Sequence, residues 1–342
     1  MKNFIFSPIQ SFYRNNLYNS LSNKDSFTVI YLNNKQDLFR SKDFIVNNNL
    51  YKKVILSEMN LIMKILYLAK IIFNSERKNI FISGWDKILY WVLVLFSINS
   101  KKILICDSFE NINNFHFLKK FFLKQVDQII VPGKMHEKFI KNFGINKKIY
   151  ITKSVGLLHN LRKKRFRKKV RKNVRNIIFV GRISREKNIC LLKKLIEKNK
   201  KITLSIYGED FINFKEEIRQ KYKDRIFYYG SKKNKIIISK IQNYDLLILP
   251  SKFEPWGLVI EEAIFSGVPV LVSSKVGCHK DLVEDYQIGK VFKNNSFNSL
   301  QYNFKKISEQ KNLNKIYENL NKLNYKTFRK KHLKIYNDLL NS

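Results

Sequence analysis

The chain has 342 residues, of which 44% are hydrophobic and 14% aromatic, and this apolar content excludes a wholly disordered protein. Its 66 Lys and Arg against 27 Asp and Glu give a net charge of +39, which favours anionic partners such as nucleotides, nucleic acid or acidic lipid headgroups. Compositional drift is an equally open interpretation, because Lys, Asn, Ile and Phe are abundant throughout.

Several classes of protein are disfavoured by what the sequence lacks. The three cysteines show no zinc or redox spacing, so we expect free thiols in a reducing compartment. Pro8 and Arg14 interrupt the apolar N-terminal segment, which therefore does not read as a secretory signal. The longest apolar run, residues 88–98, is well below the ~20 residues of a spanning helix. We expect a soluble, cytoplasmic protein.

In the N-terminal half, short apolar runs typical of strands alternate with longer runs typical of helices. The predicted strands are residues 4–9, 27–32, 53–56, 80–83, 103–106, 128–131 and 149–154. The predicted helices are residues 60–73, 87–96, 114–124 and 135–143. Because strands alternate with helices, the pattern predicts a doubly wound α/β sheet.

A basic segment follows, in which ten of the fourteen residues 162–175 (RKKRFRKKVRKNVR) are Lys or Arg. One interpretation is a solvated linker between domains. The other is a surface that attracts anionic lipid or nucleic acid. Phe166 is its only aromatic residue, which is too little for a nucleic-acid surface that stacks bases.

The same alternation restarts at residue 176. The predicted strands are residues 176–180, 202–207, 226–229, 246–249, 268–272 and 289–292. The predicted helices are residues 189–198, 214–221, 235–241 and 258–266, a helix start at 280–284, and most of the tail 300–340. We therefore predict Rossmann-like domains at 1–160 and 176–325, a linker at 161–175, and a C-terminal helix, 326–342, that can pack back on the first domain. Two such sheets leave a cleft, the usual place for a ligand.

The stretch 246–266 carries the most informative residues. Glu254 lies in a loop at the carboxyl end of a strand, where open α/β sheets bind ligands. Gly257, Leu258 and Val259 begin the next helix, and their backbone N–H groups favour an anion. Glu262 lies within that helix, on the same wall as Glu254, and this arrangement favours holding sugar hydroxyls over the facing carboxylates of a hydrolase.

Other residues leave alternatives open. Glu261 competes with Glu262 for the inward position, and helical spacing does not decide between them. Arg182 and Lys187, in GRISREKN, have the charges of a diphosphate clamp, although a basic pair carries little information in so basic a chain. His116 reads as a surface histidine, and the five histidines show no metal-ligand spacing. No GxSxG, P-loop or GxGxxG motif is present.

Taken together, VGRISREKN (180–188), LPSKFEPWGLVIEEAIFSGVPVLVS (249–273) and VGCHKDLVEDYQIGKVF (276–292) resemble the C-terminal domain of retaining glycosyltransferases of the GT-B fold, family 4, also called glycosyl transferases group 1. The family hallmark, two glutamates separated by seven residues, is met by Glu254 and Glu262. SFYRNNLYNSL (11–21), SGWDK (83–87), CDSFE (106–110) and DQIIVPGKMHEKFIKNFGI (127–145) resemble N-terminal segments of bacterial members more faintly.

This resemblance implies two Rossmann-like domains facing across a cleft, with the acceptor on residues 1–160 and the donor on 176–325. It implies transfer of a sugar from a nucleotide sugar to a glycan or lipid-linked acceptor, with retained anomeric configuration, in surface polysaccharide or lipopolysaccharide synthesis. Arg182 and Lys187 would hold the diphosphate, Glu262 the ribose and Glu254 the sugar hydroxyls. No metal or other cofactor is expected, because the two cations and the helix start can stabilise the departing diphosphate.

The chain also departs from the family pattern. Many members carry a Gly-rich loop after the first strand, whereas residues 7–10 here are Ser-Pro-Ile-Gln, so Arg14 is a candidate substitute. Asp107, in CDSFE, is a second candidate contributor from the N-terminal domain. The alternatives are a GT-B nucleotide-sugar epimerase and, with less support from the motifs, a basic nucleic-acid-binding protein. Peripheral contact with an anionic membrane is a further expectation of the charge.

Overall fold

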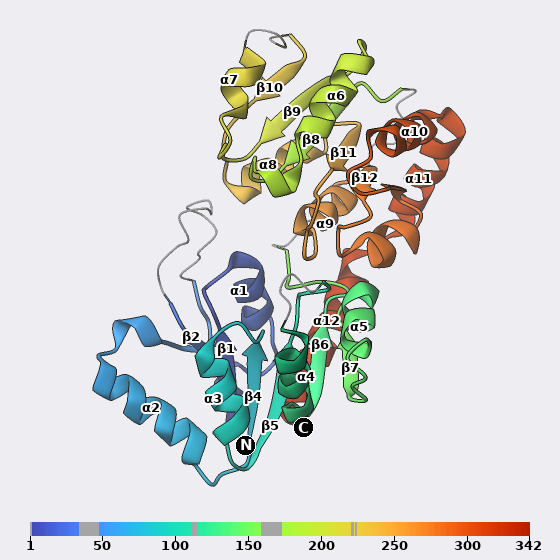
Figure 1. The fold of residues 1–342 in the computed structure, drawn as a ribbon. Coiled ribbons are helices and arrows are strands. Elements are labelled where there is room, and N and C mark those ends of the chain that lie inside the picture. Colours follow the sequence, from blue (N-terminus) through green and yellow to red (C-terminus); the bar gives the residue numbers. More distant parts are fainter. Residues whose placement is uncertain (1, 34–47, 111–114, 159–172, 220–221, 223) are drawn as a thin grey trace. The chain divides into compact units, whose positions relative to one another are not determined.

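The computed structural model describes residues 2–33, 48–110, 115–158, 173–219, 222 and 224–342 (Figure 1). They fall into two compact units. The first unit comprises Met1–His159 and Lys326–Ser342, and the second comprises Asn160–Tyr325. Most of the basic segment 162–175 lies outside the described residues, so the two interpretations of it stay open.

The first unit is built on a parallel sheet of seven strands in the order β3-β2-β1-β4-β5-β6-β7. The strands are β1 (Lys2–Ser7), β2 (Phe27–Tyr31), β3 (Lys52–Ile55), β4 (Lys78–Ser83), β5 (Ser100–Ile105), β6 (Gln128–Val131) and β7 (Lys148–Ile151). The central strands β1, β4 and β5 each contain a run of three apolar residues, and every residue of β4 is buried. Such continuous apolar runs arise because helices cover both faces of a parallel sheet.

Helices pack on the two faces of this sheet. They are α1 (Phe12–Asn19), α2 (Leu61–Phe73), α3 (Ile88–Phe96), α4 (His116–Gln125), α5 (Lys134–Lys141) and α12 (Tyr325–Asn341). Right-handed crossovers put α2, α3 and α4 on one face and α1 on the other. α12 packs on the same face as α1. The ring of Tyr336 in α12 stacks on that of Phe81 in β4, with centroids 6.3 Å apart, and Tyr336 belongs to the same buried cluster as Tyr18 of α1.

The second unit repeats this plan with a parallel sheet of six strands in the order β10-β9-β8-β11-β12-β13. The strands are β8 (Asn176–Val180), β9 (Thr203–Tyr207), β10 (Ile226–Tyr228), β11 (Leu246–Leu249), β12 (Val270–Ser273) and β13 (Gly289–Phe292). The helices are α6 (Cys190–Lys198), α7 (Phe214–Arg219), α8 (Asn234–Ile241), α9 (Leu258–Phe265), a π-helix at His279–Glu284, α10 (Phe297–Ser308) and α11 (Gln310–Lys322).

The two parallel sheets confirm the predicted doubly wound α/β architecture. β6, β8, β11 and β13 have the bounds that the apolar runs predict. One helix is missing from the prediction, α1, whose sequence FYRNNLYN contains three asparagines and has weak helix propensity. The predicted helix start at 280–284 proves to be a π-helix, and the helical tail divides into α10, α11 and α12.

Candidate functional site

In the second unit, the strand order reverses between β8 and β11. From β8 the chain continues to β9 on one side, whereas β11 lies on the other side. Loops that leave neighbouring strands in opposite directions form the ligand crevice of open α/β sheets. The loop after β8 carries Arg182 and Lys187, and the loop after β11 carries Glu254 and Gly257. The predicted residues therefore lie at one edge of one sheet, on both sides of the reversal.

Backbone hydrogen bonds fix the loop after β8 from two directions. Ile183 N–H donates to the carbonyl of Glu209 at 2.8 Å, and Lys252 N–H donates to the carbonyl of Glu186 at 2.7 Å. Gly208 allows the hydrogen bond between Ile183 and Glu209, because it lets the two loops lie close together. A Cβ on Gly208 would lie only 1.9 Å from the carbonyl oxygen of Gly181. The loop is thus positioned by its neighbours, while the side chain of Arg182 stays exposed.

Lys187 and Glu254 form an ion pair across the strand reversal. Their side chains are only 14% and 17% exposed. The backbone of Glu254 is held by the loop after β12, since its N–H donates to Lys275 at 3.0 Å and its carbonyl accepts from Gly277 at 2.9 Å. A carboxylate fixed in this way gives the more flexible Lys187 side chain a defined position.

Gly257 forms the junction between this loop and α9. Its φ of +95° lies in the left-handed region, and a Cβ would lie 2.8 Å from Cγ1 of Val276, so only glycine fits without strain. Leu258 and Val259, the first residues of α9, are half-buried. The first N–H groups of a helix have no partner within it, so this helix start can donate to an anion.

Glu261 and Glu262 are both buried, at 3% exposure each, and their partners distinguish them. Glu261 accepts a hydrogen bond from the indole of Trp256, within its own loop and helix. Glu262 accepts from the amide of Asn234, the first residue of α8, at 2.7 Å. Burial raises the pKa of Glu262 to about 7, against the opposing effect of the Asn234 hydrogen bond. Asn234 is a partner that no sequence motif signals.

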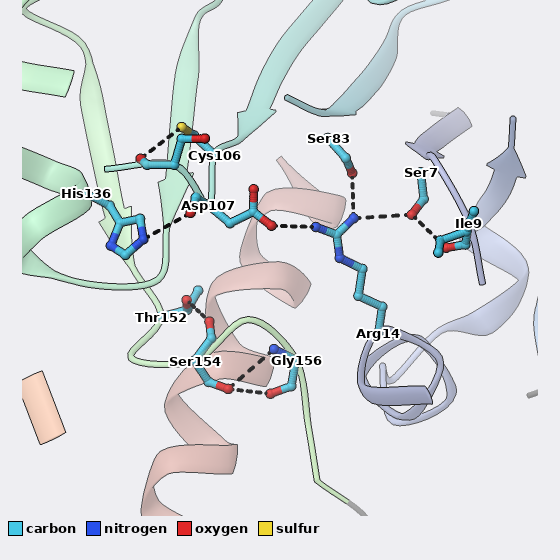
Figure 2. Close-up of polar contacts among 11 residues, drawn as sticks. Ser7, Ile9, Arg14, Ser83, Cys106, Asp107, His136, Thr152, Ser154 and Gly156 are labelled. Atoms are coloured by element: carbon cyan, nitrogen blue, oxygen red, sulfur yellow. Dashed lines mark hydrogen bonds and ion pairs between the residues drawn. The ribbon is translucent and has the colours of Figure 1, made fainter. Parts of the chain in front are cut away.

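In the first unit, Arg14 spans the corresponding strand reversal between β1 and β4 (Figure 2). Its Nη1 donates to Ser7 at the end of β1, at 3.2 Å, and to Ser83 at the end of β4, at 3.0 Å. Its Nη2 lies 3.5 Å from a carboxylate oxygen of Asp107, just after β5. The Arg14 side chain is 10% exposed and that of Asp107 is 47% exposed. Arg14 thus binds its own sheet edge, and Asp107 is the member of the pair open to solvent.

Other polar groups continue this edge (Figure 2). The imidazole of His136 lies 3.1 Å from the carbonyl of Asp107, and Thr152 donates to the carbonyl of Ser154 at 2.6 Å. His116 lies at the surface and stacks on Phe143 with ring centroids 4.5 Å apart. Within the described ranges, no group of three or more His, Cys, Asp and Glu side chains is arranged to hold a metal ion.

Comparison with known proteins finds a family that matches the second unit of the chain. Residues 161–327 match the family described as glycosyl transferases group 1. An uncharacterized 41.2 kDa protein in the cps region of Klebsiella pneumoniae is 31% identical over 166 residues, 46% of each chain. The sulfoquinovosyl transferase SQD2 of Arabidopsis thaliana is 30% identical over 115 residues, 33% of this chain and 22% of the relative. The match thus spans less than half the length of either curated relative.

Solved structures of similar fold cover nearly the whole chain. Anabaena HepE in complex with UDP has a TM-score of 0.71 at 15% identity, covering 99% of this chain and 100% of that one. WaaG, a glycosyltransferase involved in lipopolysaccharide biosynthesis, has a TM-score of 0.59 at 13% identity, covering 97% and 99%. These likenesses establish the GT-B fold, with its two Rossmann-like units. Over residues 161–327, the chain matches the family of glycosyl transferases group 1.

Proposed function

We propose that this protein is a glycosyltransferase that moves a sugar from a nucleotide sugar to a glycan or lipid-linked acceptor, with retention of anomeric configuration. The family match over residues 161–327 supports the reaction class. The relative in a cps region and the similarity to WaaG support a role in surface polysaccharide or lipopolysaccharide synthesis. The similarity to HepE, whose structure holds UDP, supports a nucleotide-sugar donor.

The observation that carries the proposal is the Lys187–Glu254 ion pair across the reversal between β8 and β11. It places a cation and a carboxylate side by side, next to the start of α9. A nucleotide sugar presents the matching chemistry, because its diphosphate is anionic and its sugar carries hydroxyl donors. In this arrangement Lys187 holds the diphosphate and Glu254 accepts hydrogen bonds from the donor sugar.

The charges at this edge suit the departure of a nucleoside diphosphate. An ammonium has three donor hydrogens, so Lys187 can hold Glu254 and a phosphate oxygen together. Arg182 is exposed on the same loop and offers a planar fork that binds two phosphate oxygens. The N–H groups of Leu258 and Val259 add the partial positive charge of a helix start. These groups stabilise the negative charge that develops on the leaving group, so the scheme needs no metal.

Glu262 supplies the contact to the nucleoside. Its carboxylate is fixed by Asn234 and buried within the first turns of α9, so it has a single orientation. When ionised, a carboxylate accepts the two hydroxyls of a ribose. In the first unit, Asp107 is the candidate contact to the acceptor, because it is half-exposed and its carboxylate is oriented by the buried Arg14.

The test is nucleotide release from UDP-, GDP- and ADP-sugars in the presence of acceptor extracts, together with calorimetric binding of the free nucleotides. We expect one nucleotide to bind and its sugar to be transferred, with a product whose anomeric configuration matches the donor by NMR. Lys187→Ala and Glu254→Ala should each lower turnover at least tenfold. Absence of binding by every nucleotide would refute the proposal. Conversion of the donor without an acceptor would instead identify an epimerase.

A further inference from the structure

The face of the first unit formed by α2, α3 and α4 exposes an unusual amount of apolar side chain. Of the twenty large hydrophobic residues exposed in the described part of the chain, fourteen lie between residues 61 and 121. We call these fourteen side chains the apolar face. Its six most exposed members, each at least 64% exposed, are Leu61, Ile62, Leu66, Phe73, Ile88 and Phe117.

The three helices form one continuous layer. α2, α3 and α4 follow β3, β4 and β5 and cross the sheet in the same direction, so they lie side by side on one face (Figure 1). α2, with the sequence LIMKILYLAKIIF, is apolar on every side, and Lys64 and Lys70 are its only charged residues. A helix of this kind is ordinarily buried. Here only Ile71 and Ile72 are buried, so most of an apolar helix faces outward.

The charge on this layer indicates what covers it. α2, α3 and α4 contain five lysines, at 64, 70, 119, 120 and 124, and no acidic residue. A partner that matches the layer has an apolar interior bordered by negative charge, which is the chemistry of an anionic lipid surface. Lysine side chains suit this position, because their stems lie along apolar surface while their heads reach phosphates.

A bilayer fits better than the other occupants of an apolar face. A symmetric contact with a second copy would bring two sets of these lysines together and would be opposed by repulsion. Insertion across a membrane does not fit either: α2 has 13 residues and spans about 20 Å, against about 30 Å for a hydrocarbon core. Among the described residues, no helix is long and apolar enough to cross a bilayer. The helices therefore suit the interface, lying in its plane.

We propose that the apolar face docks the first unit on a bilayer that contains anionic lipids. Helices that connect parallel strands run opposite to them, so α2, α3 and α4 begin at the carboxyl edge of the sheet. Leu61, Ile88 and Phe117 lie at these helix starts, and Arg14 and Asp107 lie at the same edge. Docking thus brings the polar edge of this unit next to the headgroups. The proposal does not depend on the glycosyltransferase reaction.

Vesicle co-sedimentation of the full chain tests the docking. We would compare equimolar phosphatidylglycerol and phosphatidylcholine with phosphatidylcholine alone. The test variant combines Ile62→Ser, Leu66→Ser, Ile88→Ser and Phe117→Ser, which removes apolar surface and leaves the net charge at +39. The matched control combines Ile236→Ser and Tyr302→Ser, two exposed apolar residues of the second unit. Melting by circular dichroism verifies that both variants fold.

We expect the wild type and the control to bind anionic vesicles, and the test variant to bind at least tenfold more weakly. Equal binding by the test variant would overturn the proposal, because general basic charge, including residues 162–175, would then suffice. Absence of binding by the wild type would also overturn it. So would a wild type that dimerises without binding vesicles and becomes monomeric in the test variant, since the face would then be an interface between copies. Nucleotide binding, measured separately, reports on the proposed function and not on docking.

Discussion

Lys187 and Glu254 are separated by 67 residues in sequence and form an ion pair where the strand order of the second sheet reverses. Both side chains are mostly buried, so removing one partner leaves the other charge poorly solvated. We expect Lys187→Met and Glu254→Gln each to destabilise the second unit by about 1–3 kcal/mol, below the cost for a fully buried pair. The double variant should cost less than the sum, because it leaves no unpaired charge.

Urea unfolding measures this coupling if the signal comes from the second unit alone. The three tryptophans are Trp85, Trp91 and Trp256, so a Trp85→Phe, Trp91→Phe background leaves Trp256 as the only reporter. Trp256 is buried beside Glu261, close in sequence to Glu254. Additivity of the two single changes to within about 0.5 kcal/mol would show that the pair contributes no coupling.

Arg182 should affect binding without affecting stability. Its side chain is exposed, so Arg182→Ala should change the free energy of unfolding by less than about 0.5 kcal/mol. If it binds the diphosphate, the same change should weaken nucleotide affinity at least tenfold, and Arg182→Lys should restore affinity only in part, because a point charge does not replace a fork. Arg185→Ala, exposed on the same loop, is the matched control for calorimetry. Equal losses of nucleotide affinity in Arg182→Ala and Arg185→Ala would show that the effect comes from general positive charge and not from a specific contact of Arg182.

Gly257 should tolerate no side chain. Gly257→Ala combines a φ of +95° with a Cβ 2.8 Å from Val276, so we expect a loss of about 2–4 kcal/mol in the Trp256-reported unfolding. Gly230→Ala isolates the backbone effect, because φ there is +67° and the nearest atom lies at 3.9 Å. It should cost only about 1 kcal/mol. If both changes cost the same, the contact with Val276 is unimportant.

The sequence predicts every strand in the described part of the chain, whereas one helix, α1, is absent from the prediction. β8 and β11 are continuous apolar runs bounded by turn residues, the pattern of a strand buried on both faces, and their predicted bounds agree with the structure. α1 has no comparable local signal. Its buried Arg14 and Tyr18 are held by partners elsewhere in the chain, so tertiary contacts override weak propensity.

For the candidate site, the sequence identifies residues but not their contacts. Glu254 and Glu262 can be named from the spacing of two glutamates, and the structure adds that Lys187 pairs with the first and Asn234 with the second. Neither pairing can be read from the sequence, because the partners are 67 and 28 residues apart and no periodic pattern connects them. The hydrogen bond that Ser83 accepts from Arg14 cannot be read from the sequence for the same reason.

Glu262 should make stability depend on pH. Its pKa is raised from 4.5 to about 7 by burial, so the folded state binds this proton more tightly than the unfolded state. The stabilisation that the bound proton gives the folded state is fully present below about pH 4.5. It is lost as pH rises through about 7, which lowers the free energy of unfolding by up to about 3 kcal/mol. Glu262→Gln should remove this slope, so the variant gains stability relative to the wild type between pH 5 and 8. Glu318→Gln, an exposed glutamate on α11, is the control. Parallel pH profiles for Glu262→Gln and the wild type would contradict this assignment.

Arg14 should be the strongest polar determinant of the first unit. Its guanidinium reaches Ser7, Ser83 and Asp107 at once, which joins β1, β4 and the end of β5. Arg14→Ala should therefore destabilise this unit by about 2–4 kcal/mol, because it removes charge-assisted hydrogen bonds from a buried position. Arg14→Lys should recover less than half of the loss, since a single ammonium cannot replace the two guanidinium nitrogens that face the serines and Asp107. A Trp256→Phe background, which leaves Trp85 and Trp91, restricts the fluorescence signal to the first unit.

Asp107→Asn should cost less than about 1 kcal/mol, because that carboxylate is 47% exposed. Equal losses for Arg14→Ala and Asp107→Asn would mean that the ion pair, and not the bonds to the serines, holds this edge of the sheet together.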